Sequence, residues 1–181
     1  MNFRSAILLI QNTKAVSYKK GEIVIPEGSQ EKIVLFIRKG LLRSFYTDVE
    51  KVEEITFQLY PERNIALNLH SVLFGEPSKF VYQAIEDTKA FQIDYSSLIA
   101  LTSKNSDLIN FNRTYLTKNV LGKVFTRMES FVFLSPEERY EKFVKNNPSL
   151  VNRTPDKYIA NVLGITPVSL SRIRSRITKK S

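Results

Sequence analysis

The chain has 181 residues, a net charge of +9, 43% hydrophobic residues and 25% charged residues, which suits a globular protein with one large or two small domains. It has no cysteine and one histidine, which excludes disulfides, thiolate metal sites, cysteine-ligated iron–sulfur clusters and multi-histidine metal sites. No apolar run reaches the roughly 20 residues that span a bilayer, and the first apolar segment is too short for a signal peptide, so we expect a cytoplasmic protein.

Residues 3–13 carry apolar side chains at a helical spacing, which predicts a short leading helix. From Val16 to Ile93, short β-prone runs alternate with Gly and Pro turns. These runs are residues 23–25, 33–37, 41–46, 55–57, 80–82 and 90–93. Many short strands at fairly even spacing predict an antiparallel sandwich or jelly roll. His70 lies in an apolar stretch, so we expect a packed side chain and not a catalyst.

After the strands the spacing becomes helical again. Residues 96–101 predict a short helix, and residues 105–133 predict a long one with an apolar stripe along one face. The stripe consists of Ile109, Leu116, Val120, Val124, Met128 and Phe131. Such a seam can pack on the β domain, on a second copy of the chain, or on both.

Ser135-Pro136-Glu137-Glu138 matches a capping box with proline at the first helical position. It predicts a helix that ends at Asn146-Asn147-Pro148, followed by a short connection over residues 149–153.

Residues 154–174 read as two short helices joined by a tight turn. Thr154-Pro155 and Thr166-Pro167 each offer an N-cap hydroxyl followed by proline, and Gly164 can adopt the positive φ that ends the first helix. Ala160 is small enough for a close helix crossing, and Leu170 can bury against the first helix. This spacing predicts a helix-turn-helix, whose second helix enters the DNA major groove. An ordinary helical hairpin in a core is the alternative.

The positive charge is concentrated at the end of the chain. From Ser135 onward there are ten Lys and Arg residues and four Asp and Glu residues, a balance of +6. A basic segment attracts polyanions, and its overlap with the predicted helix-turn-helix indicates DNA. A basic tail that serves solubility alone is the alternative.

Two groups of motifs resemble a known family. Gly21-Glu22, Glu27-Gly28 and the run 36–43 resemble the turns of a cyclic-nucleotide-binding β-roll, and Phe74-Gly75-Glu76 resembles the start of its phosphate-binding cassette. The run 135–174 resembles the C-terminal domain of Crp/Fnr-type transcription regulators, in the form common in Bacteroidota.

This resemblance implies an α+β protein in three parts. Residues 1–104 would form an antiparallel β-roll (a jelly roll) that acts as the effector domain. Residues 105–134 would form a long linker and dimerisation helix, and residues 135–181 a helix-turn-helix DNA-binding domain. A β-hairpin wing usually follows the recognition helix in this family. Only Thr178–Ser181 remain here, so we expect the wing to be absent.

The helical period assigns the faces of the recognition helix, residues 166–178. Its core-facing positions are Leu170, Ile173 and Ile177. The opposite face carries Val168, Ser171, Arg172 and Ser175. We expect Arg172 to be the main base reader, through guanine N7 and O6, with Ser169 and Val168 also touching base edges. The expected phosphate partners are Thr166, Ser171, Ser175, Arg176 and Lys179.

The effector of the β-roll is harder to assign. In the resembled cyclic-nucleotide sites a glutamate holds the ribose and an arginine neutralises the cyclic phosphate. Glu76, after Gly75, matches the glutamate, but Ser78 or Lys79 stands nearest to the position of the arginine. The bidentate fork is therefore missing, and we do not expect cyclic AMP to be the effector. The roll would bind another small molecule or serve only as a dimer scaffold, and haem is not expected.

The sequence as a whole predicts a homodimeric, sequence-specific transcription regulator that binds double-stranded DNA, with RNA polymerase as a further candidate partner and no cofactor or membrane partner. An enzyme is not expected, because the chain has no Gly-rich phosphate loop, no metal-ligand cluster and no nucleophile motif. The alternative is a small-molecule sensor that acts through a protein partner without reading DNA.

Overall fold

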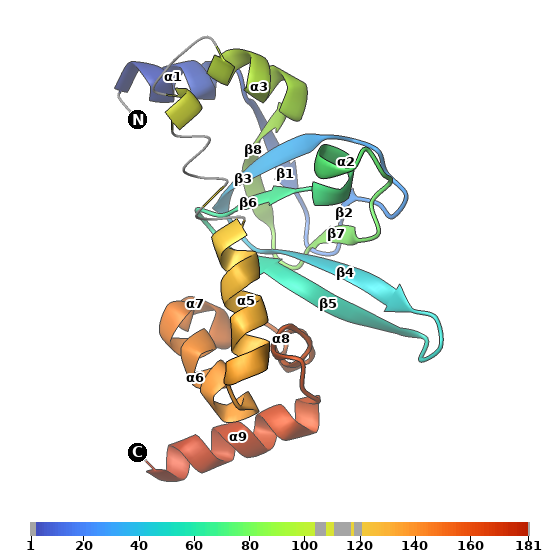
Figure 1. Ribbon diagram of the computed structural model, residues 1–181, viewed down its shortest axis with the longest axis vertical. Coiled ribbons are helices and arrows are strands. Elements are labelled where there is room, and N and C mark those ends of the chain that lie inside the picture. The colour runs from blue at the N-terminus through green and yellow to red at the C-terminus, as the bar shows by residue number, and fades with distance from the viewer. Residues whose placement is uncertain (1–2, 104–107, 111–116, 118–120, 181) are drawn as a thin grey trace.

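The computed structural model of the chain describes residues 3–103, 108–110, 117 and 121–180, with the side chains of residues 3–6 and 179–180 left aside. The strands form one end of the molecule, and the last four helices form the other (Figure 1). Within these described ranges, no helix combines the length and apolarity that a membrane crossing requires.

Two four-stranded antiparallel sheets make up the strand-rich end. The first has the order β1-β8-β3-β6, and its strands are β1 (Lys14–Tyr18), β8 (Thr88–Asp94), β3 (Ile33–Lys39) and β6 (Ile65–Leu67). The second has the order β2-β7-β4-β5, and its strands are β2 (Ile23–Ile25), β7 (Val81–Ala84), β4 (Leu42–Asp48) and β5 (Glu53–Tyr60). Every pair of neighbouring strands is antiparallel, as the predicted jelly roll requires.

Side chains fill the space between the two sheets. Ile25, Leu35 and Leu42 are completely buried there. The rings of Tyr60 and Tyr82 lie 5.8 Å apart, and the Tyr82 hydroxyl donates to the Leu67 carbonyl at 2.7 Å. Burial raises the pKa of both tyrosines.

Each of the six predicted β-prone runs overlaps a strand. Sequence reasoning missed β1, β6 and the short helix α2 (Leu69–Leu73). β1 lies at a sheet edge and has no fully buried side chain, so its apolar signal is weak. The predicted packing of His70 agrees with its place in α2, where its half-buried ring contacts Phe74 and Phe80.

Apart from α2, the following helices before residue 134 overlap helices that the sequence predicted. They are α1 (Phe3–Gln11), α3 (Tyr95–Ser103) and α5 (Gly122–Phe133). α5 forms the end of the predicted long helix. Part of that prediction lies outside the described residues, namely positions 105–107, 111–116 and 118–120. Leu116 and Val120 of the predicted stripe are among them. No residue of α5 is buried in the single chain.

The capping box at Ser135 is confirmed. The Ser135 hydroxyl accepts from the Glu138 amide at 3.3 Å, and the Ser135 amide donates to the Glu138 carboxylate at 2.8 Å. These bonds lower the pKa of Glu138. The helix α6 (Pro136–Asn146) begins here and ends at the predicted position. The next segment contains a turn of helix, α7 (Pro148–Val151), where the sequence predicted a plain connection.

The last two helices are α8 (Asp156–Leu163) and α9 (Pro167–Lys180), and α8 packs on the β4–β5 hairpin. Arg43 of β4 is 1% exposed, and its guanidinium lies between the Phe45 ring, at 4.0 Å, and the Tyr158 ring of α8, at 4.2 Å. The Thr56 amide donates to Asn161 Oδ1 of α8 at 3.1 Å, close to a register shift in β4–β5.

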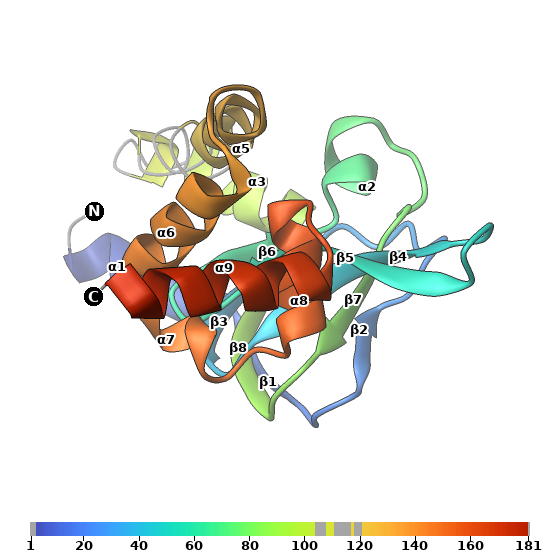
Figure 2. The ribbon, with the colours of Figure 1, turned by 90° about the horizontal axis from the view of Figure 1, so that it is seen from below.

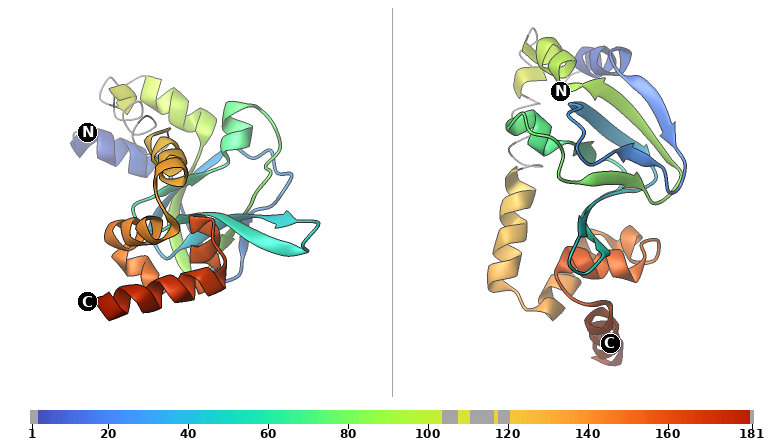
Figure 3. Two further views of the ribbon diagram at one scale, coloured as in Figure 1. Left: turned by 60° about the horizontal axis from the view of Figure 1, so that its bottom comes forward. Right: turned by 90° about the vertical axis from the view of Figure 1, so that its right-hand side faces the viewer.

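A second contact between the two ends of the molecule involves Arg153, which lies between α7 and α8. Its guanidinium donates to Glu62 at 2.9 and 3.1 Å, to Glu86 at 2.8 and 2.9 Å, and to the Gly40 carbonyl at 3.0 Å. α8 therefore lies between the sheets and α9, and α9 crosses the end of the molecule away from the sheets (Figures 2 and 3).

Candidate nucleic-acid interface

A small hydrophobic core holds α6, α8 and α9 together. Its buried members are Tyr140, Ile159, Ala160, Leu163, Leu170 and Ile173. Ala160 and Leu170 have no exposed surface, and Ile177 packs at the edge of the core. The predicted roles of Ala160 as the close-crossing residue and of Leu170 as the buried partner are confirmed.

The turn between α8 and α9 depends on Gly164. This residue has φ +66° and ψ +38°, the left-handed conformation that the sequence predicted. Its amide donates to the Asn161 carbonyl at 2.9 Å, and the Ile165 amide donates to the Ala160 carbonyl at 3.0 Å. These bonds satisfy carbonyl groups at the end of α8 and let the chain turn sharply into α9.

Thr166 caps α9 as predicted. Its hydroxyl accepts from the Ser169 amide at 3.1 Å, and Pro167 occupies the first helical position. The Ser169 hydroxyl is also within hydrogen-bond distance of the Thr166 hydroxyl, at 2.9 Å. Both proposed DNA-contacting hydroxyls are therefore already engaged with each other in the cap.

The predicted cap at Thr154 is wrong. α8 begins at Asp156 with Pro155 as its N-cap, and no side chain caps it. The Thr154 amide donates to the Leu150 carbonyl at 3.0 Å, which ties the residue to the preceding turn. Its side chain is 5% exposed and its hydroxyl has no partner among the described residues. Thr154 therefore belongs to the end of the preceding turn and does not cap α8.

The outer face of α9 is open to solvent. Val168 is 62% exposed, Ser171, Arg172 and Ser175 are also exposed, and Ser169 is half-buried. Arg172 makes no hydrogen bond or ion pair with any residue that the structure describes. The predicted division of α9 into a core face and an open face is confirmed.

The other cations of α9 are arranged differently. Arg174 turns inward, donating to the Tyr140 hydroxyl at 3.1 Å and to the Asp156 carboxylate at 2.7 Å. Sequence reasoning gave Arg174 no role, since no local pattern shows that Tyr140 lies under it. Arg176 is exposed and pairs with Glu137 at 3.4 Å. Lys179 lies in the last turn of α9, and its side chain lies outside the described residues.

The four predicted effector residues lie in the connection between α2 and β7. Gly75 has φ +69°. Glu76 and Lys79 are exposed and lie 3.9 Å from each other. Ser78 is 3% exposed, and its hydroxyl donates to the Phe80 carbonyl at 2.7 Å. The exposed charged groups on this connection are therefore one carboxylate and one ammonium that pair with each other, and the serine stabilises the turn.

No metal site emerges from the part of the chain that the structure describes, in which no three or more His, Asp or Glu side chains gather.

Comparison with solved structures gives the fold. FixK2 from Bradyrhizobium japonicum matches with a TM-score of 0.76 and 19% identity, over 93% of this chain and 85% of that one. CooA from Carboxydothermus hydrogenoformans, a mutant, matches with a TM-score of 0.73 and 16% identity, over 99% and 82%. A protein from Eubacterium rectale, described as a regulator of the Crp/Fnr family, matches with a TM-score of 0.68 and 19% identity, over 99% and 85%. This chain has a Crp/Fnr-like fold.

The Crp/Fnr-like fold places the sheets and the C-terminal helices as the sequence resemblance implied. The structural neighbours named above are transcription regulators and not enzymes. No protein-family model matches the sequence, and a search of curated proteins finds no match either.

Proposed function

We propose that this protein is a homodimeric, sequence-specific DNA-binding transcription regulator whose helix α9 enters the major groove. In this proposal residues 1–104 form a sensing or scaffolding roll, residues 105–134 link and dimerise, and residues 135–181 read DNA.

The observation that carries the proposal is the open face of α9. Arg172 projects from it with no partner among the residues that the structure describes, while Leu170 and Ile173 on the opposite face fix the helix to its core. A free guanidinium in the first turns of such a helix can donate two hydrogen bonds to guanine N7 and O6. The +6 balance after Ser135 adds a general attraction to phosphates.

The remaining residues of the proposed interface divide by chemistry. Val168 offers an apolar contact for a thymine methyl group, and Ser169 a hydroxyl for a base edge. Thr166, Ser171, Ser175, Arg176 and Lys179 are assigned to phosphates, which fix the position of the helix without reading sequence. Arg176 would exchange its contact with Glu137 for a phosphate.

A second copy of the chain is proposed to pack on α5. The exposed apolar side chains of this helix are Val124, Phe125, Met128, Phe131, Val132 and Phe133. Six large apolar side chains exposed on one short helix are uncommon in a protein that works as a monomer. A two-fold dimer would place two α9 helices in half-sites about one DNA turn apart.

A small-molecule effector is proposed to bind at Gly75, Glu76, Ser78 and Lys79. We expect it to be neither cyclic AMP nor haem. RNA polymerase is the proposed protein partner at a promoter.

The test begins with selection of bound duplexes from a random DNA pool. We expect a palindromic product, and then a loss of about 1–3 kcal/mol in affinity for that product in the Arg172→Ala variant, with a much smaller loss for random duplex. Arg38→Ala, which removes an exposed arginine from β3, is the matched control and should change neither affinity.

Three outcomes would contradict the proposal or part of it. Without enrichment of any sequence, DNA readout fails and the sensor that acts through a protein partner is favoured. Equal losses on selected and random duplexes would make Arg172 a phosphate contact only. Binding that does not weaken steeply with log[salt] would show that phosphates contribute little.

A further inference from the structure

A cavity of about 660 Å³ lies between the sheets and the C-terminal helices. Phe57 and Leu59 of β5 border it on one side, Lys123 and Arg127 of α5 on a second, and Phe143 of α6 on a third. A smaller cavity of about 390 Å³ adjoins it between α5 and α6 and shares Arg127 and Phe143 with it.

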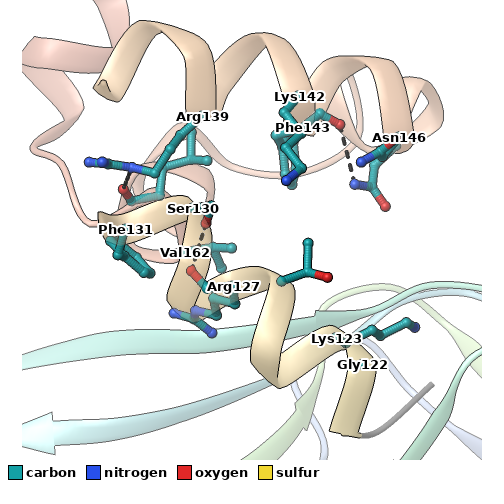
Figure 4. Close-up of a pocket in the computed structure, with 13 residues that line it drawn as sticks. Gly122, Lys123, Arg127, Ser130, Phe131, Arg139, Lys142, Phe143, Asn146 and Val162 are labelled. Atoms are coloured by element: carbon teal, nitrogen blue, oxygen red, sulfur yellow. Dashed lines mark hydrogen bonds between the residues drawn. The ribbon is translucent and has the colours of Figure 1, made fainter. Parts of the chain in front are cut away.

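The charged groups at these cavities are all positive. Lys123 and Arg127 border both, and Arg139 and Lys142 border the smaller one. Among the described residues that line the two cavities, none is an aspartate or a glutamate. In Figure 4, Lys123 and Arg127 come from α5, while Lys142, Phe143 and Asn146 come from α6.

Three of these cations have N–H groups that make no hydrogen bond to a described residue. Arg127 donates to the Phe57 carbonyl and stacks on the Phe57 ring at 4.5 Å, which leaves most of its five N–H groups unused. Lys123 donates to Asn64 Oδ1. Lys142 has no partner in the described part of the chain. Arg139 differs, because its guanidinium already donates to the carbonyls of Leu163 and Leu134.

The position of Lys123 and Arg127 has an electrostatic cost. Partial desolvation lowers the pKa of each group, and the described lining residues include no carboxylate that would compensate their charge. Cations that line a partly enclosed cavity without a described carboxylate in its lining favour an anion from solution.

The remaining lining of the larger cavity is mostly apolar. It includes Leu59, Phe131, Phe143, Leu150 and Val162. Asn146 and Asn147 add polar side chains at the edge. An apolar lining with a few convergent polar groups is the usual composition of a small-molecule site, and the volume lies in the usual range for one.

We propose that the two adjoining cavities, which share Lys123, Arg127 and Phe143, together bind one organic anion. Its carboxylate or phosphate group would be held by Arg127 together with Lys123 and Lys142, and its aromatic or aliphatic body would pack on Phe143, Leu150 and Val162. The site is separate from residues 75–79, and the proposal stands whether or not the protein binds DNA.

A ligand here would contact both ends of the molecule at once. Leu59 belongs to the sheets, Arg127 to α5, and Phe143 and Val162 to the helices that carry α9. Ligand binding would therefore stabilise this relative arrangement of the sheets and the helices.

The experiment is isothermal titration calorimetry on the full chain with matched probes. 2-Naphthoate and 2-naphthyl phosphate carry the anion, 2-naphthamide lacks the charge, and inorganic phosphate lacks the apolar body. We expect one of the two organic anions to bind at least tenfold more tightly than the amide and than inorganic phosphate. Which of the two binds more tightly distinguishes a carboxylate from a phosphate ligand.

Variants then locate the site. Arg127→Gln and Lys142→Gln should each weaken binding of the preferred anion by about tenfold or more. Lys145→Gln, which removes an exposed charge from the same helix as Lys142, should leave binding of that anion unchanged. Arg127 also stacks on Phe57, so loss of fold in that variant is checked by its unfolding curve. Lys142 carries no such contact and keeps the test decisive.

Several results would overturn the proposal. The proposal fails if neither organic anion binds, or if the neutral amide binds as tightly as the organic anions. It also fails if Lys142→Gln and Lys145→Gln weaken binding of the preferred anion equally. Amide chemical-shift changes confined to the exposed side of α5 would also overturn it, since the probe would then occupy the proposed dimer surface.

Discussion

Gly164 shows how one residue sets the geometry of the α8–α9 turn. A side chain at its φ of +66° would be strained in any L-residue, and an added Cβ would lie 2.6 Å from the ring edge of Phe131. The glycine therefore satisfies two requirements at once, a left-handed backbone and a close approach to α5.

We predict that Gly164→Ala lowers the free energy of unfolding by at least about 1–2 kcal/mol, the usual cost of the left-handed conformation in a residue with a Cβ. Urea unfolding measures this. Gly28→Ala is the matched control, because Gly28 has φ +76° with nothing within 4 Å of an added Cβ. If Gly164→Ala loses more free energy of unfolding than Gly28→Ala, the difference measures the clash of the added Cβ with the Phe131 ring. Equal losses would mean that the ring moves aside without cost.

Substitution of Leu170 tests whether the core of α6, α8 and α9 supports the proposed interface. It is completely buried among α6, α8 and α9. We predict that Leu170→Ala lowers the free energy of unfolding by about 2–5 kcal/mol, because it removes apolar contacts and leaves a cavity. Val168→Ala, on the exposed face of the same helix, should change it by less than about 0.5 kcal/mol. Similar losses in chemical denaturation would contradict the assignment of the two faces.

At the scale of whole elements, α5 exposes a large apolar surface in the single chain. None of its residues is buried, although Arg127 and Lys123 reach across to the sheets. Phe125 and Met128, one turn apart, are 67% and 61% exposed. Two copies that pair along this face would remove both from water.

We predict that Phe125→Glu shifts the protein from dimer to monomer and weakens dimerisation by at least tenfold, because a carboxylate would be desolvated in an apolar interface. Sedimentation equilibrium measures the mass. Val49→Glu is the control, since Val49 is also apolar and is 84% exposed at the β4–β5 turn. If the parent chain is monomeric at every concentration, the proposed dimer surface is wrong.

At the scale of the whole molecule, the contact of Arg153 with Glu62 and Glu86 connects the sheets to the helices. Burial alone would raise the pKa of Glu62, but hydrogen bonds from Arg153 and from the Gly40 amide outweigh it, so the pKa is lowered. The same contacts raise the pKa of Arg153. A carboxylate with a lowered folded pKa stabilises the protein fully above its ordinary pKa of 4.5, and this stability is lost as pH falls through the lower folded value.

We therefore predict that Glu62→Gln destabilises the chain by on the order of 1 kcal/mol at pH 7, and that the difference from the parent shrinks as pH falls from about 6 to about 3. Unfolding free energies across that range measure it. Glu27→Gln removes an exposed carboxylate that makes no bond in the described part of the chain, and should show no such trend. A constant difference at all pH values would exclude the ion pair as its cause.

Much of the fold could be predicted because its signals are local. The strand runs, the capping box at Ser135, the glycine at residue 164 and the two faces of α9 each depend on residues within a few positions of one another. The candidate interface was predictable for the same reason, since the exposure of Arg172 follows from the helical period around Leu170 and Ile173.

The sequence by itself thus determined the locally signalled elements, among them the start of α6 and the turn at Gly164, and which side of α9 is free. Only the tertiary structure decided that Thr154 is buried and not a cap, that Arg174 turns to Tyr140, and that cations without carboxylates surround a cavity. The physical reason is sequence separation: Arg153 bonds to Glu62, 91 positions away, and no local period records such a contact. Burial and pairing at that range follow from packing, and packing exists only once the sheets and the helices have come together.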